Sequence, residues 1–245
     1  LRAGDDFEVA VLAVSVGMIP HVCRHIVSAD ARWDAMVRNI GTVATQSFQL
    51  WLDADERALG WEGPVGITLS GFAAPFDTWA SMSHLLSRES WDGLHPPRAV
   101  AYFCGSLADE AAAAGPAAAD AAVRAAAIGF LDRHIGDLWA DAVDGDGRFR
   151  WELLHDPAGA PPGPERFANQ YWRANIDPSD RYVQSLPGTD RHRIRPDDSG
   201  YDNLLLAGDW TDCGLNAGCI EAATRSGVLA AAAIIAGRVP AGAGR

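Results

Sequence analysis

The sequence predicts a mixed α/β fold, and three features of the chain support this prediction. Residues 204–207 form a short apolar run, which is followed by a glycine-rich segment and then by a helical pattern. The middle of the chain holds runs in which apolar and polar residues alternate, as in strands with one buried face. Residues 117–139 are rich in alanine and have the apolar spacing of an amphipathic helix. Strands and helices mixed in this way indicate sheets covered by helices.

The first predicted strand covers residues 7–15, because apolar and β-branched side chains dominate this stretch. Residues 16–20 then lead toward a helix. Alternation over much of residues 42–52 predicts a strand with one buried face. Further strands are expected in the central region at residues 65–72, 98–104 and 149–154.

Residues 204–207 predict a parallel strand that is covered on both faces and ends at Gly208. Asp209 then places a carboxylate at the carboxyl end of the strand, where open α/β sheets bind ligands. Gly214 and Gly218 allow the backbone to pass close to a bulky group. Free amides at the start of the following helix would point toward an anion or an electron-rich carbonyl. The apolar stripe expected on this helix consists of Ile220, Ala223, Val228 and Leu229.

Residues 201–227 resemble, over their full length, the C-terminal flavin-binding motif of the flavin-containing amine oxidase and phytoene desaturase superfamily. Within this stretch, Ala-Gly-Asp-Trp at 207–210 and Gly-Cys-Ile-Glu-Ala-Ala at 218–223 are similar to the squalene- and carotenoid-associated desaturase branch, which includes hydroxysqualene dehydroxylase-like proteins. The resemblance implies FAD as the cofactor. It also implies an α/β fold in which a substrate domain, with a mixed or antiparallel sheet and helices, is inserted into a Rossmann-like FAD-binding domain.

The domain bounds that this resemblance implies divide the chain into three segments. Residues 1–41 are the returning segment of the FAD-binding domain. Residues 42–187 form the substrate domain, and residues 188–245 form the C-terminal part of the FAD-binding domain.

The resemblance further implies how individual residues meet FAD. Asp209 would approach the ribityl and phosphate portion, and Gly208 would make room for it. The amides of Gly218, Cys219 and Ile220 would face the pyrimidine edge of the isoalloxazine ring, where a donor stabilises the negative charge that develops when the ring takes up hydride. The remaining cofactor-binding candidates are Trp210, Gly214, Asn216 and Ala217 in the same turn, and Val14 and Ser15 near the adenosine half. No catalytic residue is assigned.

Two further segments, residues 75–84 and 169–182, also resemble the desaturase-like branch and could line the flavin face. The central region is rich in aromatic side chains, which could wall an apolar tunnel for a polyisoprenoid or form an ordinary core. Both alternatives stay open from the sequence. The side chains are Trp51, Trp61, Phe72, Phe76, Trp79, Trp91, Tyr102, Phe103, Trp151, Tyr171 and Trp172.

FAD proteins of this class normally begin with a strand and a Gly-x-Gly-x-x-Gly turn that holds the pyrophosphate. The sequence contains no such motif: Gly145-Asp-Gly147 lacks the third glycine, and Gly242-Ala-Gly244 lies at the extreme C-terminus. The chain also begins with Leu1 rather than Met. We therefore expect the C-terminal portion of a longer flavoprotein, whose own affinity for FAD is poor.

Composition narrows the classes of partner. The formal net charge is -12 and the chain contains no lysine, so a nucleic-acid partner is not expected. An acidic surface is repelled by an anionic membrane, although a local patch can still touch lipid. Four cysteines without metal-like spacing fit reduced thiols in a cytoplasmic protein. His21 and His25 are four residues apart without a third ligand, so no metal site is expected.

The sequence thus predicts a flavoprotein whose full-length form oxidises or desaturates a hydrophobic, isoprenoid-type substrate by hydride transfer to FAD. One alternative is a flavin amine oxidase that acts on a small amine or polyamine. Another is a non-catalytic module that cannot hold FAD alone. The sequence does not give the oligomeric state.

Overall fold

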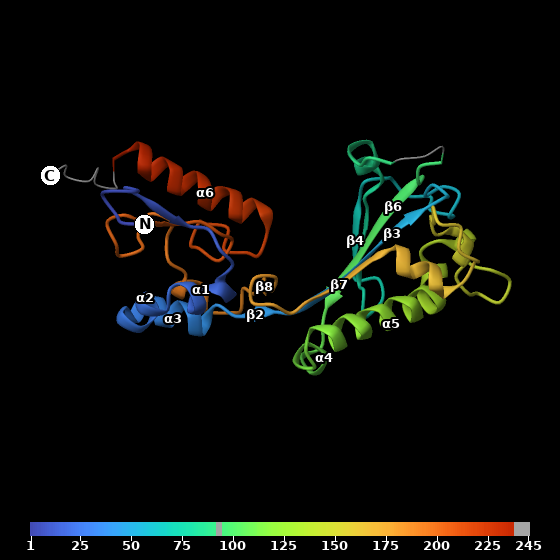
Figure 1. The fold of residues 1–245 in the computed structure, drawn as a ribbon, viewed down its shortest axis with the longest axis horizontal. Helices are drawn as coiled ribbons and strands as arrows, with labels where there is room; N and C mark the ends of the chain where they lie inside the picture. Colours follow the sequence, from blue (N-terminus) through green and yellow to red (C-terminus); the bar gives the residue numbers. More distant parts are fainter. Residues whose placement is uncertain (92–94, 238–245) are drawn as a thin grey trace. The chain divides into compact units, whose positions relative to one another are not determined.

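The computed structural model describes residues 1–91 and 95–237 and divides into two compact units. Unit 1 consists of Leu1–Val43 together with the chain from Asp177 onward, and unit 2 consists of Ala44–Ile176. Both units are drawn in Figure 1. The glycines at 242 and 244 lie outside the described residues.

The substrate domain was expected to cover residues 42–187, whereas unit 2 covers residues 44–176. Thr42, Val43 and residues 177–187 lie in unit 1. The reason is a strand pair, because β2 (Thr42–Val43) runs antiparallel to β8 (Tyr182–Val183). Gln184 also donates its amide to the carbonyl of Gly41 at 2.9 Å. These bonds tie both connecting segments to unit 1.

The centre of unit 1 is a parallel pair of strands, β1 (Ala10–Leu12) and β9 (Leu204–Leu206). The strand predicted at 204–207 is confirmed, and its chain leaves the ladder at Ala207. The strand expected over residues 7–15 is only three residues long. Its ladder with β9 covers Ala10–Leu12, and the last bond runs from the amide of Ala207 to the carbonyl of Leu12 at 2.9 Å.

Helices cover both faces of this pair (Figure 1). On one face, Leu206 packs with Ile19, Trp33 and other buried side chains of the N-terminal helices. On the other face, Leu205 packs with Ala230 of α6. Successive residues of β9 therefore point to opposite layers, as the continuous apolar run predicts. The helical elements of this unit are η1 (Val16–Met18), α1 (Ile19–Val22), α2 (Arg24–Ala29), α3 (Ala31–Asn39), η7 (Asp190–His192) and α6 (Ile220–Ile235).

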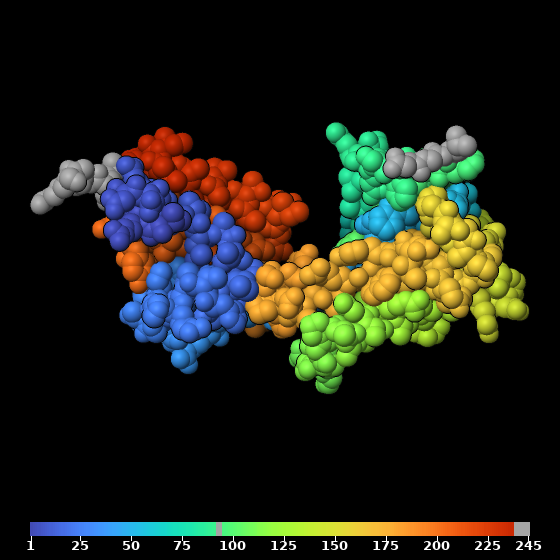
Figure 2. Space-filling model, viewed as in Figure 1, coloured from blue at the N-terminus to red at the C-terminus, as the bar shows by residue number. Residues whose placement is uncertain are grey.

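Helix α6 is confirmed, but the expected apolar stripe is wrong. The buried face of α6 consists of small side chains, namely Ala222, Ser226, Ala230 and Ala233. Ile220 and Val228 are 82% and 63% exposed. Small side chains let the helix backbone approach the sheet closely, so the larger aliphatic side chains lie on the outside. Figure 2 shows α6, in red, as an outer layer of unit 1.

Unit 2 contains, among the described residues, a five-stranded antiparallel sheet with the order β4-β5-β6-β3-β7. The central strands β3 and β6 pair in register over eight residues. The strands predicted at 65–72 and 98–104 are confirmed in this sheet as β4 and β6. The strand predicted at 42–52 is divided: its residues 45–52 form β3 of this sheet, while Thr42 and Val43 form β2 in unit 1. β5 and β7 were not predicted. The strands are β3 (Thr45–Leu52), β4 (Thr68–Ser70), β5 (Thr78–Ser81), β6 (Ala99–Ser106) and β7 (Tyr171–Asn175).

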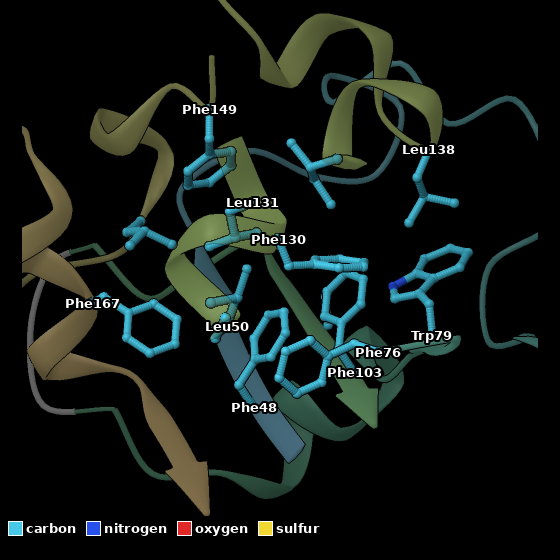
Figure 3. Packing of buried hydrophobic residues seen from close by; sticks show 14 of the residues in the cluster. Phe48, Leu50, Phe76, Trp79, Phe103, Phe130, Leu131, Leu138, Phe149 and Phe167 are labelled. Atoms are coloured by element: carbon cyan, nitrogen blue, oxygen red, sulfur yellow. The ribbon is translucent and has the colours of Figure 1, made fainter. Parts of the chain in front are cut away.

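The helix predicted over residues 117–139 is confirmed as α5 (Pro116–His134), which continues as the 3-10 turn η3 (Ile135–Asp137). Its side chains Phe130 and Leu131 are fully buried beside the sheet residue Phe48, as Figure 3 shows. The rings of Phe48 and Phe103 stack with their centroids 4.7 Å apart. The other short helices are α4 (Asp109–Ala113), η2 (Ser83–Arg88), η4 (Ala140–Ala142), η5 (Trp151–Leu153) and η6 (Pro164–Asn169).

The strand expected at 149–154 is wrong, because this stretch forms the 3-10 turn η5. Only its two ends make strand-like bridges, from Phe149 to Val143 and from Leu154 to Leu52. Both of these end residues are buried. The stretch was predicted as a strand because it has apolar residues at both ends, but these residues are buried on either side of a turn.

Candidate functional site

The glycine-rich turn leaves the carboxyl end of β9 at Gly208, where the backbone has no room for a side chain. A Cβ atom on Gly208 would lie 2.3 Å from Nε1 of Trp210. The amide of Gly208 donates to Oγ of Ser226 on α6 at 2.7 Å. Trp210 is fully buried, and its indole N–H donates to the carbonyl of Val14 at 2.9 Å. The turn is therefore fixed to α6 on one side and to the segment after β1 on the other.

The turn ends where α6 begins. Cys219 is the N-cap, and its Sγ accepts a hydrogen bond from the amide of Ala222 at 3.4 Å. A Cβ on Gly218 would lie 2.7 Å from the carbonyl oxygen of Val183, so the turn passes close to β8. Within the described part of the chain, the amides of Gly218, Cys219 and Ile220 donate no hydrogen bond to the protein. Three donors are thus left for a ligand at the positive end of the α6 dipole.

A pocket of about 520 Å³ opens beside these donors, within the size range of small-molecule sites. Four segments of unit 1 line it: residues 13–16, 180–183, 208–210 and 218–223, the last without Ala222. The candidates Val14, Ser15, Gly208, Asp209, Trp210, Gly218, Cys219 and Ile220 are all among the lining residues.

Gly214, Asn216 and Ala217 are not among the residues that line this pocket. They form the bend that carries the chain from the buried Cys213 to the start of α6. Gly214 has a φ of +86° and lies against Arg225, since a Cβ there would be 3.3 Å from its guanidinium. Asn216 has a φ of +50°, and its carbonyl accepts a hydrogen bond from Ser185 at 2.7 Å. These residues shape the turn without reaching the pocket.

Ser15 lies where the segment after β1 meets residues 177–180. Its hydroxyl donates to the carbonyl of Pro178 at 3.0 Å. A Cβ on Gly17 would lie 2.3 Å from that same carbonyl oxygen, so the two segments are in close contact. This contact brings Val14 and Ser15 beside residues 180–183.

Residues 180–183 form one wall of the pocket, and most of this wall belongs to a segment that was expected to line a flavin. Of the segment 169–182, expected to line a flavin, Asp180, Arg181 and Tyr182 reach the pocket, while residues 171–175 form β7 in unit 2. Arg181 donates from Nε to Oγ1 of Thr42 at 3.0 Å, which fixes the segment to β2. This long-range strand pairing, together with the hydrogen bond from Ser185 to the carbonyl of Asn216, holds the wall beside the turn. Residues 75–84 contain β5 and also lie in unit 2.

The electrostatics of the pocket centre on Asp209 and Arg193. Burial raises the pKa of the Asp209 carboxyl, and the positive charge of Arg193 partly opposes this rise. The Arg193 side chain is fully buried, and it donates from Nη1 to the carbonyl of Asp209 at 2.6 Å. Sequence reasoning missed Arg193, because no local motif joins it to the turn.

The aromatic side chains of the central region mainly form the core of unit 2. Phe76, Trp79 and Phe103 are fully buried in one cluster with the residues of α5. Trp61, Phe72, Trp151 and Trp172 pack against the edge of that cluster. For these seven side chains the structure describes a core, while Trp51, Trp91, Tyr102 and Tyr171 do not belong to this cluster.

Two further properties concern metals and membranes. Across residues 1–91 and 95–237, no group of three or more His, Cys, Asp or Glu residues is arranged to hold a metal ion. Over the same residues, none of the helices is both long and apolar enough to cross a bilayer.

Comparison with known proteins bears on the class of this chain. Residues 149–235, which include β9, the glycine-rich turn and α6, match the family model of flavin containing amine oxidoreductases. A crystal structure of an oxidoreductase from Methanosarcina mazei resembles the chain with a TM-score of 0.54 at 12% sequence identity. The match covers 93% of this chain and 43% of the archaeal one, so the chain spans less than half the length of that protein. No curated protein sequence matches.

The comparisons show the fold of the chain and a family match over part of its length. The chain has the mixed α/β fold of this oxidoreductase. Its strand, turn and helix at 204–235 fall within the match to the flavin containing amine oxidoreductases.

Proposed function

We propose that the chain is the flavin-contacting part of an FAD-dependent oxidoreductase, with the flavin ring beside the start of α6. The observation that carries this proposal is the set of three unpaired amides at Gly218, Cys219 and Ile220, which border a pocket at the carboxyl end of a parallel strand. The family match over residues 149–235 supports it. The residues fit a flavin because its pyrimidine edge offers carbonyl acceptors to such donors.

In this proposal each segment of the pocket contacts a different part of FAD. The amides of 218–220 hold the pyrimidine edge and stabilise the negative charge that develops there. The Asp209 carboxylate accepts hydrogen bonds from the ribityl hydroxyls. Val14, Ser15 and residues 180–183 fix the remaining sides and limit access of water. When bound, FAD supplies the acceptor for a hydride from the substrate.

For the substrate we propose a hydrophobic, isoprenoid-type molecule, which is oxidised or desaturated. Support for this comes from the similarity of residues 207–210 and 218–223 to the desaturase branch. Most aromatic side chains of unit 2 add nothing to this support, because they pack into a core.

The second candidate is oxidation of an amine. The observation that favours it is the family model itself, which describes flavin containing amine oxidoreductases. An assay that compares an amine panel with a polyprenyl panel, and follows reduction of the bound flavin under anaerobic conditions, separates the two candidates. Flavin bleaching by amines alone would overturn the isoprenoid proposal.

The proposed flavin site is tested by removing one amide donor while the helix is kept. Ile220 is the first residue of α6 and 82% exposed, and Cys219 before it is extended, with φ -155° and ψ 160°. Proline is accepted at the first helical position after an extended residue. Ile220→Pro therefore deletes one N–H with little other change, and Ile220→Ala is the matched control that keeps it.

We expect Ile220→Pro to weaken FAD binding by about three- to tenfold, the worth of one hydrogen bond. It should also shift the midpoint potential of the bound flavin to more negative values. Titration followed by flavin fluorescence, and reduction followed by absorbance, measure the two effects. The proposal fails if the protein purified from its own host carries no flavin and takes none up on reconstitution. It also fails if Ile220→Pro and Ile220→Ala behave alike.

A further inference from the structure

Arg193 makes an unusual set of contacts for a residue outside the pocket. Its guanidinium donates from Nη1 to the carbonyl of Asp209 at 2.6 Å and from Nη2 to Oγ of Ser185 at 2.9 Å. Ser185 in turn donates to the carbonyl of Asn216 at 2.7 Å. One buried side chain therefore reaches both ends of the turn, directly at residue 209 and through one hydroxyl at residue 216.

Burying the charged guanidinium of Arg193 costs free energy, because the charge loses its hydration. The side chain of Arg193 has no exposed area, and its nearest carboxylate, on Asp190, is 3.4 Å from Nε and 56% exposed. Nε has no hydrogen-bond partner among the described residues. A buried guanidinium that is only partly neutralised is poor evidence of a gain in stability. Its planar fork is, however, well suited to hold two acceptors at a fixed separation.

The backbone that follows Arg193 is also hydrogen-bonded to the turn and to β9. The carbonyl of Ile194 accepts the amide of Asp212 at 3.0 Å, and the carbonyl of Pro196 accepts the amide of Leu206 at 3.0 Å. Residues 193–196 thus run alongside β9 and its turn. The guanidinium is the part of this segment that reaches the two ends of the turn.

We propose that Arg193 is the positioning residue of this turn, and that its links to Asp209 and, through Ser185, to Asn216 hold the amides of Gly218–Ile220 and the Asp209 carboxylate in place for a ligand. This inference rests on the proposed function for the identity of the ligand, which is a flavin. The links themselves can be tested without any ligand. A lysine could not replace the arginine, because a single ammonium cannot span both acceptors in one plane.

The experiment compares four variants with the unaltered chain. Arg193→Ala removes both links, Arg193→Lys keeps the charge without the fork, and Ser185→Ala cuts only the link to Asn216. Arg195→Ala is the matched control, because Arg195 lies two residues further on, is 55% exposed and pairs only with Asp197 among the described residues. Ser185 is exposed, so Ser185→Ala remains informative if Arg193→Ala does not fold.

The first readout is hydrogen exchange without flavin. The amides of Gly208, Asp212 and Cys213 have hydrogen-bond acceptors in or beside the turn and report on its order. We expect their exchange to accelerate at least tenfold in Arg193→Ala and in Arg193→Lys, while the central turns of α6 stay as protected as before. Ser185→Ala should accelerate the exchange of the Cys213 amide alone. Arg195→Ala should leave the exchange of all three amides unchanged.

The second readout is the Kd for FAD and the visible spectrum of the bound flavin. We expect at least a tenfold weaker Kd and an altered spectrum for both Arg193 variants, about a threefold weaker Kd for Ser185→Ala, and no change for Arg195→Ala. If the unaltered protein purified from its own host carries no flavin and takes none up, the proposed function fails, while the exchange data still decide whether Arg193 positions the turn. Unchanged exchange in Arg193→Lys and Ser185→Ala would overturn the inference. Acceleration spread evenly through unit 1 would also overturn it, because it would show a merely structural role.

Discussion

Trp210 illustrates at the scale of single residues how the pocket is held together. Its ring is fully buried, and its N–H donates to the carbonyl of Val14 in the segment that follows β1. The same nitrogen occupies the space that a Cβ on Gly208 would need. A glycine and a tryptophan two residues apart therefore depend on each other, and the similarity of residues 207–210 to a known motif has this packing as its physical basis.

The half-buried carboxyl of Asp209 leads to a prediction about pH. Burial raises its folded-state pKa above the ordinary value of 3.8. A raised pKa means that the protonated carboxyl favours the folded state, and that this stability is lost as the pH rises through the folded pKa. Asp209→Asn removes the ionisation. We expect the free energy of unfolding of Asp209→Asn, relative to the unaltered chain, to increase as the pH rises from below 3.8 through the folded pKa.

Urea denaturation at a series of pH values measures this difference. Asp212, which follows in the same turn, provides the control Asp212→Asn. A stability difference between Asp209→Asn and the unaltered chain that does not vary with pH would contradict the assignment of a buried, titrating carboxyl.

At the scale of elements, the close contact of α6 with β9 depends on small side chains. Ala230 is 2% exposed and packs with Leu205 and Ala233. A larger side chain has no space there, so Ala230→Leu should lower the free energy of unfolding by about 1–3 kcal/mol. Val228→Ala, two residues earlier and 63% exposed, should change it by less than about 0.5 kcal/mol. Chemical denaturation followed by circular dichroism measures both, and equal stability of the two variants would contradict this packing.

Local patterns predicted those elements that a single stretch of chain determines. The apolar run at 204–207, the glycine at 208 and the helix after 218 are each encoded locally, and all are present. The helix α5 could also be predicted, because its amphipathic pattern lies within one stretch of the chain. Its buried residues Val123, Phe130 and Leu131 recur with helical spacing.

Elements that depend on distant partners could not be predicted. β8 is two residues long and exists because β2, on the far side of unit 2 in the sequence, pairs with it. The buried face of α6 was misjudged because hydrophobicity favours large side chains, whereas the close approach to β9 requires small ones. Arg193 could not be predicted as part of the site, because no sequence motif links it to its acceptors on Asp209 and Ser185, which it contacts only in the folded structure.

At the scale of the whole molecule, each unit has its own core, and the pocket belongs to unit 1 alone. Its segments come from both sides of unit 2 in the sequence, so residues 13–16 and 180–183, far apart in the chain, lie side by side in the pocket. The chain spans 43% of the Methanosarcina mazei oxidoreductase. The proposed flavin site lies entirely on segments of unit 1.

The most direct test of the central claim is a titration of the isotope-labelled chain with FAD, followed by amide resonances in a two-dimensional NMR spectrum. The account predicts saturable shifts that are largest for Gly218, Cys219 and Ile220, smaller shifts for residues 208–210 and 14–15, and little change in the core of unit 2 around Phe130. Saturable binding that leaves the amides of 218–220 unmoved while other residues shift would contradict the claim that these donors face the flavin.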